Sequence, residues 1–170
     1  MLTDNFGRRF SYLRLSITDV CNFSCNYCLP DGYQCDQPRD FLSLCEIKRI
    51  AKAFAELGTE KIRITGGEPA LRKDLPEIIR ICKETSGIKK VAITSNGFKL
   101  PEHLPQWLDA GIDAINISID SLDPRQFHAI TGHDKLKTIL TGIDMALADG
   151  GASVKVNTVL MSDHSGREIK

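Results

Sequence analysis

The sequence Cys21-Asn-Phe-Ser-Cys25-Asn-Tyr-Cys28 places three cysteines within eight residues, directly after a run that alternates like a β-strand. Thiolates are soft ligands, and so short a loop can direct three of them at one face of an iron–sulfur cube. A cube has four irons, so three thiolates leave one iron without a protein ligand. A small molecule can chelate that iron and receive an electron from it. The C-x3-C-x2-C spacing therefore predicts a 4Fe–4S cluster on Cys21, Cys25 and Cys28.

Zinc binding and disulfide bonding are the other common uses of cysteine. Zinc sites usually pair two C-x2-C units or combine one with distant histidines, and the remaining Cys35, Cys45 and Cys82 supply no second pair. A disulfide framework is typical of small secreted chains, and the first residues show no apolar stretch typical of a secretion signal. The sequence favours the cluster over both alternatives.

The overall composition narrows the setting of this chemistry. The chain has 170 residues, enough for one domain, with 22 basic and 22 acidic residues and a formal net charge of zero. This balance gives no electrostatic reason to expect a nucleic-acid or membrane partner. No apolar run reaches the length of a transmembrane helix. A cluster and reactive thiols favour a reducing, cytoplasmic location.

Strand-like and helix-like segments alternate along the chain, which predicts parallel strands joined by helical crossovers. The expected strands are Tyr12–Thr18, Ile62–Thr65, Val91–Thr94, Ala114–Asp120 and Val154–Leu160. The expected helices are one opened by the capping box Ser43-x-x-Glu46 and ended by Gly58, one capped by Asp74, a short one through Leu104 and Leu108 ended by Gly111, and segments near Pro124–Ile130 and Leu136–Ala148.

The strand faces decide between an open doubly wound sheet and a curling barrel. Strands covered on both sides by helices tend to be apolar throughout, whereas these alternate. One face is apolar, and the other is predicted to carry Arg14, Ser16, Arg63, Thr65, Ala92, Thr94, Asn116, Ser118, Lys155 and Asn157. We therefore expect an α/β fold in which residues 1–170 form a single domain. It is a partial barrel of about five parallel strands with outer helices, ending before closure.

Three cations on the predicted inner face, Arg14, Arg63 and Lys155, need counter-charges. A bound anion such as a polyphosphate would supply them. Each cation alone is better explained by a carboxylate partner or by solvent at the strand end. For the three together, both explanations remain open.

Several longer segments narrow the interpretation further. Together with the cysteine loop, the chain resembles the radical S-adenosylmethionine (radical SAM) enzymes, and within them it is similar to the GTP 3′,8-cyclase family of molybdenum cofactor biosynthesis. The resemblance covers essentially the whole chain. The segments that carry it are Leu13-Arg-Leu-Ser-Ile-Thr-Asp-Val-Cys-Asn22, Cys28-Leu-Pro-Asp-Gly32, Arg63-Ile-Thr-Gly-Gly-Glu-Pro69 and Val154-Lys-Val-Asn-Thr-Val159.

The resemblance implies a reaction and a set of site residues. S-adenosylmethionine chelates the open iron and is cleaved, and the resulting radical takes hydrogen from the GTP ribose, whose carbon then attacks C8 of guanine. Cys21, Cys25 and Cys28 resemble the cluster ligands; Tyr27, Gly67 and Ser118 the S-adenosylmethionine contacts; and Arg14, Arg63, Thr94 and Lys155 the GTP contacts. Gly66 and Gly67 suit close approach of the backbone to a ligand, because a Cβ at either position would be expected to collide with it. Cys35, Cys45 and Cys82 match nothing in the family pattern, and Cys82 is predicted to be a small core residue.

The resemblance also implies parts that these residues do not supply. The family carries a second 4Fe–4S cluster on three C-terminal cysteines, a sixth strand and a later S-adenosylmethionine contact, none matched here. We expect a truncated barrel without full turnover. Expected partners are an electron donor such as flavodoxin or ferredoxin, the next pathway enzyme (cyclic pyranopterin monophosphate synthase) and a second copy in a homodimer. Another radical SAM activity, peptide-modifying or activating, or a non-catalytic 4Fe–4S module remain as alternatives.

The cysteine assignment is directly testable. Each cysteine is replaced by alanine in turn, and iron is measured after anaerobic reconstitution. Loss of iron is expected for Cys21→Ala, Cys25→Ala and Cys28→Ala only, because these three are the predicted ligands. Full loading of Cys25→Ala, or loss confined to Cys82→Ala, would overturn the assignment.

Overall fold

Five parallel strands form one sheet in the computed structural model, which describes residues 2–34 and 40–161. The strands are adjacent in the order in which they occur along the chain. They are β1 (Tyr12–Ser16), β2 (Lys61–Thr65), β3 (Lys90–Ser95), β4 (Ala114–Ser118) and β5 (Ser153–Asn157). A doubly wound sheet reverses its strand order at a switch point, whereas this one does not. The predicted α/β partial barrel is therefore confirmed.

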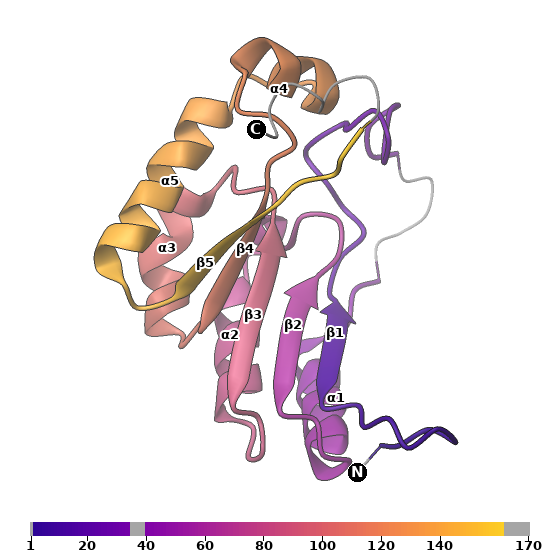
Figure 1. Ribbon diagram of the computed structural model, residues 1–170. Helices are drawn as coiled ribbons and strands as arrows, with labels where there is room; N and C mark the ends of the chain where they lie inside the picture. Colours follow the sequence, from indigo (N-terminus) through magenta and orange to yellow (C-terminus); the bar gives the residue numbers. More distant parts are fainter. Residues whose placement is uncertain (1, 35–39, 162–170) are drawn as a thin grey trace.

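The crossover helices lie on one side of this sheet. Figure 1 shows α1 and α2 behind the strands and α3 and α5 at the left, beside β4 and β5, while α4 lies beyond the carboxyl ends of the strands. The helices are α1 (Leu44–Glu56), α2 (Leu75–Glu84), α3 (Leu100–Asp109), α4 (Pro124–Thr131) and α5 (Leu136–Asp149), with a 3-10 turn η1 at Pro69–Leu71. None of the helices in residues 2–34 and 40–161 has the length and apolar character to span a membrane.

The sheet has an apolar and a polar face, as the alternation predicted. Ile64, Ile93 and Ile115 are register partners in one row, fully buried against the helices. Parallel register partners point to the same face, and so do residues two apart along a strand. The register pairs Arg14 with Arg63, Thr94 with Asn116, and Asn116 with Lys155 therefore confirm that the predicted polar residues share the opposite face.

Three strands end earlier than the sequence predicted. β1 ends at Ser16, β4 at Ser118 and β5 at Asn157, instead of Thr18, Asp120 and Leu160. After β4 and β5, hydrogen bonds that involve side chains replace the backbone pairing of the strands. The Thr158 hydroxyl donates to the Ile119 carbonyl at 2.7 Å, and the Val159 amide donates to the Asp120 carboxylate at 2.8 Å. Strand hydrogen bonding thus gives way to side-chain contacts between β4 and β5 at the carboxyl edge.

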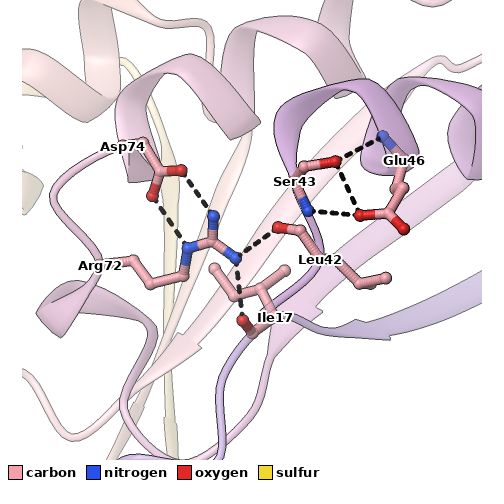
Figure 2. Close-up of polar contacts among 6 residues, drawn as sticks. All are labelled: Ile17, Leu42, Ser43, Glu46, Arg72 and Asp74. Carbon is pink, nitrogen blue, oxygen red and sulfur yellow. Dashed lines mark hydrogen bonds and ion pairs between the residues drawn. The ribbon is translucent and has the colours of Figure 1, made fainter. Parts of the chain in front are cut away.

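The helix caps were predicted in part. Both halves of the capping box at α1 are present, with the Ser43 hydroxyl accepting from the Glu46 amide and the Glu46 carboxylate accepting from the Ser43 amide at 2.8 Å. Asp74 occupies the N-cap position of α2, but its side chain does not cap the helix. Its carboxylate instead accepts two hydrogen bonds from Arg72 (Figure 2), which lower the pKa of Asp74.

The three other cysteines differ in position. Cys82 is completely buried in the core on α2, where burial raises the pKa of its thiol to about 12, as expected of a small core residue. Cys45 is exposed at the start of α1. The prediction made for Cys35 concerns a position outside the described residues.

The free edge of β5 leads to a prediction about association. Among the described residues β5 pairs only with β4, and its Val156 is 51% exposed. Exposed strand edges of this kind pair with other chains. We expect sedimentation velocity to show association that increases with the concentration of the chain. Val156→Lys is expected to weaken it, because a lysine on an edge strand disfavours pairing, whereas Val159→Lys, beyond the strand, serves as the control. A monomer at all concentrations, or equal effects of the two variants, would contradict this.

Candidate active site

The cysteine loop, Cys21–Cys28, follows β1 at the carboxyl edge of the sheet, in the violet stretch above β1 in Figure 1. Its Phe23 side chain is buried and stacks on the His133 ring at a centroid distance of 4.9 Å. The Asn26 amide donates to the Ile130 carbonyl at 2.9 Å. Contacts with residues more than a hundred positions later therefore fix the loop against the end of α4.

The thiols of this loop lie in an environment that disfavours their unliganded anions. Cys21 and Cys25 are partly buried and Cys28 is exposed. Burial raises the pKa of Cys21, and burial followed by repulsion from Cys21 raises the pKa of Cys25 to about 11. Bound iron would compensate thiolate charges that water reaches only in part. The donor set therefore fits an iron–sulfur cluster.

A site for a single metal ion would need a different arrangement of ligands. In the described ranges, no three His, Cys, Asp or Glu side chains are grouped so as to hold one metal ion. A cube requires another arrangement, since each cysteine binds its own iron. The cluster assignment stays a prediction.

Two glycines after β2 allow the neighbouring chain to approach closely. The Gly67 amide donates to the Thr18 carbonyl at 2.8 Å, and the Glu68 amide donates to the Val20 carbonyl at 2.7 Å. A Cβ on Gly66 would lie 2.1 Å from the Thr18 oxygen, and one on Gly67 would lie 2.3 Å from the Val20 oxygen. We expected a collision with a ligand, but the atoms that a Cβ meets belong to the protein's own backbone.

Glu68 is a carboxylate that sequence reasoning left without a role. Its side chain is buried and accepts hydrogen bonds from the Ala70 amide (2.9 Å), the Ser95 hydroxyl (2.8 Å) and the Asn96 amide (2.6 Å). Burial nevertheless raises the pKa of Glu68. The Asn96 side chain also donates to the Asn22 side chain at 2.9 Å, next to Cys21. Glu68 thus joins the loops after β2 and β3 to the cysteine loop.

Asp120 makes a second such connection. The Tyr27 hydroxyl donates to one oxygen of its carboxylate at 2.6 Å, while the other oxygen accepts from the Val159 amide. Burial, followed by this hydrogen bond, raises the pKa of Tyr27. The predicted S-adenosylmethionine residues Tyr27, Gly67 and Ser118 therefore all come from segments at the carboxyl edge, and Asp120 links the first of them to β4.

The polar face contains two buried side-chain atoms without a partner. Nε of Arg63 and Oγ1 of Thr94 are buried and make no hydrogen bond to any described residue. The Arg63 guanidinium lies 5.7 Å from the centroid of the Tyr12 ring. Unsatisfied buried polar atoms are rare in proteins and call for an explanation, such as a ligand.

Three cations on this face, Arg14, Arg63 and Lys155, have no described carboxylate within ion-pair distance. The carboxylate alternative for Arg14, Arg63 and Lys155 is therefore wrong for the described part of the chain. Arg14 and Lys155 are exposed to solvent, whereas Arg63 is partly buried. Exposure to solvent, the other alternative, therefore fits Arg14 and Lys155, whereas Arg63 is left without a counter-charge among the described residues.

The sequence offered some signal that Asp120 and Glu68 belong to the site. Asp120 is a carboxylate at the end of the predicted fourth strand, and Glu68 belongs to one of the segments that carry the family resemblance. Their partners could not have been suspected, because Tyr27 and Asn96 lie far from them in sequence.

Comparison with known proteins places this geometry in a family. The sequence model of the Radical SAM superfamily matches residues 15–170. GTP 3′,8-cyclase of Pectobacterium atrosepticum is 60% identical over 164 residues, covering 95% of this chain and 50% of that protein. GTP 3′,8-cyclase of Yersinia pestis is 57% identical over 168 residues, covering 99% of this chain and 52% of that protein. The chain spans about half the length of these curated relatives.

Solved structures agree in fold. SuiB of Streptococcus suis, bound to S-adenosylmethionine, superposes with a TM-score of 0.77 at 18% identity, covering 94% of this chain and 36% of that one. Native anSMEcpe with bound AdoMet gives a TM-score of 0.72 at 15% identity, covering 92% and 46%. At such identities the likeness concerns the fold alone.

The close backbone contact at Gly67 predicts a strong effect of one methyl group. Gly67→Ala places a Cβ against the Val20 carbonyl, so we expect a loss of at least about 2 kcal/mol in the free energy of unfolding. Gly151→Ala is the control, because its Cβ would meet only the ends of the flexible Asp149 and Leu108 side chains. Its cost is expected to stay within about 0.5 kcal/mol. Chemical denaturation measures both, and equal stabilities would refute the contact.

Proposed function

Because the chain belongs to the radical SAM superfamily, we propose that it forms the cluster-binding half of a GTP 3′,8-cyclase, a lyase of molybdenum cofactor biosynthesis. The identity of 57–60% to curated cyclases across nearly the whole chain supports this choice. It favours the cyclase over a peptide-modifying or activating enzyme. The solved structures named above, at 15–18% identity, support only the shared fold.

One observation on the chain itself carries the proposal. Arg63 and Thr94 direct buried, unpartnered polar atoms to the same face of the sheet, whose carboxyl edge carries the cysteine loop. Burying such atoms without a partner costs free energy, so a bound polar molecule is the simplest source of their missing hydrogen bonds. The cations Arg14 and Lys155 on the same face make an anionic molecule the best fit.

The proposed roles follow from these positions. Cys21, Cys25 and Cys28 hold the 4Fe–4S cluster, which when bound supplies the electron that cleaves S-adenosylmethionine. Tyr27, Gly67 and Ser118 contact S-adenosylmethionine at the carboxyl edge. Arg14, Arg63, Thr94 and Lys155 bind GTP, the cations neutralising its phosphates. Holding both molecules on one rigid sheet brings the reacting groups close together.

The remaining partners belong to the same proposal. We expect reduction by a flavodoxin or ferredoxin, transfer of the product to cyclic pyranopterin monophosphate synthase, and a homodimer in the cytoplasm. The second 4Fe–4S cluster of the family is expected in the half of the relatives that these residues do not match. The 170-residue chain assayed by itself should therefore release 5′-deoxyadenosine slowly at most and form no cyclised nucleotide, because the second cluster of the family helps to bind GTP.

Thr94→Val provides the sharpest test. The change removes an unpartnered buried hydroxyl, so the free energy of unfolding should stay constant or rise by up to about 1 kcal/mol. GTP binding should weaken by roughly tenfold, because the ligand loses a hydrogen bond. Denaturation and calorimetry with the reconstituted protein measure the two effects, with guanosine as the phosphate-free comparison.

Thr141→Val is the matched control, since Thr141 is exposed on α5 and donates to the Lys137 carbonyl. It should leave GTP affinity unchanged. Equal affinity for GTP and guanosine would remove the phosphate role. A Thr94→Val variant that is less stable yet binds GTP normally would show that the hydroxyl serves the fold, and the proposal would lose its main support.

A further inference from the structure

Arg72, directly after η1, uses nearly all the hydrogen bonds that a guanidinium can donate. Its Nε and Nη2 donate to the two oxygens of Asp74 at 2.9 and 2.5 Å. Its Nη1 donates to the carbonyls of Ile17 at 3.1 Å and Leu42 at 3.0 Å. Four of its five N–H donors are thus engaged. The side chain is only 9% exposed, and Figure 2 shows it between the three partners.

The two carbonyls bound by Nη1 lie on opposite sides of the cysteine loop in the sequence. Ile17 directly follows β1 and precedes Cys21 by four residues. Leu42 directly precedes Ser43, which caps α1. One nitrogen therefore joins the residue where the chain leaves the sheet towards the cysteines to the residue where it returns to a helix.

The neighbouring backbone amides are engaged elsewhere and do not replace Arg72 as the donor to the Ile17 carbonyl. The Ile17 amide donates to the Thr65 carbonyl, and the Thr18 carbonyl accepts from Gly67. The carbonyl of Ile17, between these two bonds, has Arg72 as its donor. A buried carbonyl that loses its donor is costly, so removal of Arg72 would favour rearrangement of the backbone just before Cys21.

Lysine could not reproduce this contact. An ammonium group has no planar fork, so it cannot hold a carboxylate with two parallel hydrogen bonds while a third nitrogen bridges two carbonyls. Asp74 also gives up the helix cap expected of it in order to hold the guanidinium. The contact between Arg72 and Asp74 therefore depends on the planar shape of the guanidinium as well as on its charge.

We propose that Arg72 is a positioning residue for the cluster: by bridging the Ile17 and Leu42 carbonyls it sets the direction in which the chain enters the cysteine loop. The inference rests on the proposed function, because it assigns Arg72 to the same three cysteines. It adds a residue that touches none of the predicted ligands and acts through the backbone before Cys21.

Hydrogen exchange of the whole chain before reconstitution tests the contact without a cluster. In Arg72→Lys we expect amides of residues 18–28 to exchange roughly tenfold faster or more, since charge-assisted hydrogen bonds are lost. Strand β3 should keep its protection. Asp74→Asn keeps an acceptor for Nε, so a smaller change in the same residues is expected. Arg80→Lys is the matched control, because Arg80 pairs only with partly or fully exposed Glu77 and Asp109.

Reconstitution then tests the link to the cluster. Arg72→Lys should lose iron to a chelator several-fold faster than Arg80→Lys and should broaden the electron paramagnetic resonance signal of the reduced cluster. Unchanged exchange at residues 18–28, exchange that rises equally in β3, or an unaltered signal would each overturn the proposal. If Arg72→Lys does not fold, Asp74→Asn decides by the same readouts. If the unmodified chain takes up no iron, the proposed function fails, while the exchange experiment still decides whether Arg72 positions the loop.

Discussion

The parallel register of the sheet is the constraint on which the other features depend. Because the five strands run in sequence order without reversal, their carboxyl ends meet at one edge and their alternating side chains share one face. The edge gathers the cysteine loop, the glycine turn after β2, and Asp120. The face gathers the cations with Thr94. A single geometric rule thus brings the two halves of the proposed chemistry, the radical source and the anionic substrate, onto the same sheet.

Backbone contacts fix the segment that leads into the cysteine loop. The Gly67 and Glu68 amides donate to the carbonyls of Thr18 and Val20. This approach is possible only because Gly66 and Gly67 lack a Cβ. Glu68 then fixes the same turn to the loop after β3 through buried hydrogen bonds. The motif that identifies the family therefore has a structural role within the chain itself, whatever it contacts in a bound ligand.

Local patterns predicted what local forces decide. The alternation of the strands and the capping box at Ser43 involve residues close in sequence, and both are present as expected. The prediction that the Asp74 side chain caps α2 was wrong, because its carboxylate binds Arg72 instead. Arg72 is itself held by hydrogen bonds to the Ile17 and Leu42 carbonyls. The strand ends were also misplaced, since Asp120 takes the Val159 amide out of the ladder. The polar face followed from alternation, but which of its atoms lack a partner depends on segments that are distant in sequence and pack around them.

The two faces of the sheet differ in their contribution to stability, which explains how the sheet tolerates the unpartnered polar atoms of Arg63 and Thr94. Val91 and Ile93, on the same strand as Thr94, point to the helix side and are fully buried there, so that side supplies the hydrophobic free energy of the strand. Thr94 itself contributes nothing by hydrogen bonding and leaves its hydroxyl without a partner. A sequence selected for stability alone would replace it with valine, which has the same shape and no polar group to desolvate. Its presence beside Asn116, in the row that ends at Lys155, is therefore better explained by a ligand than by the fold.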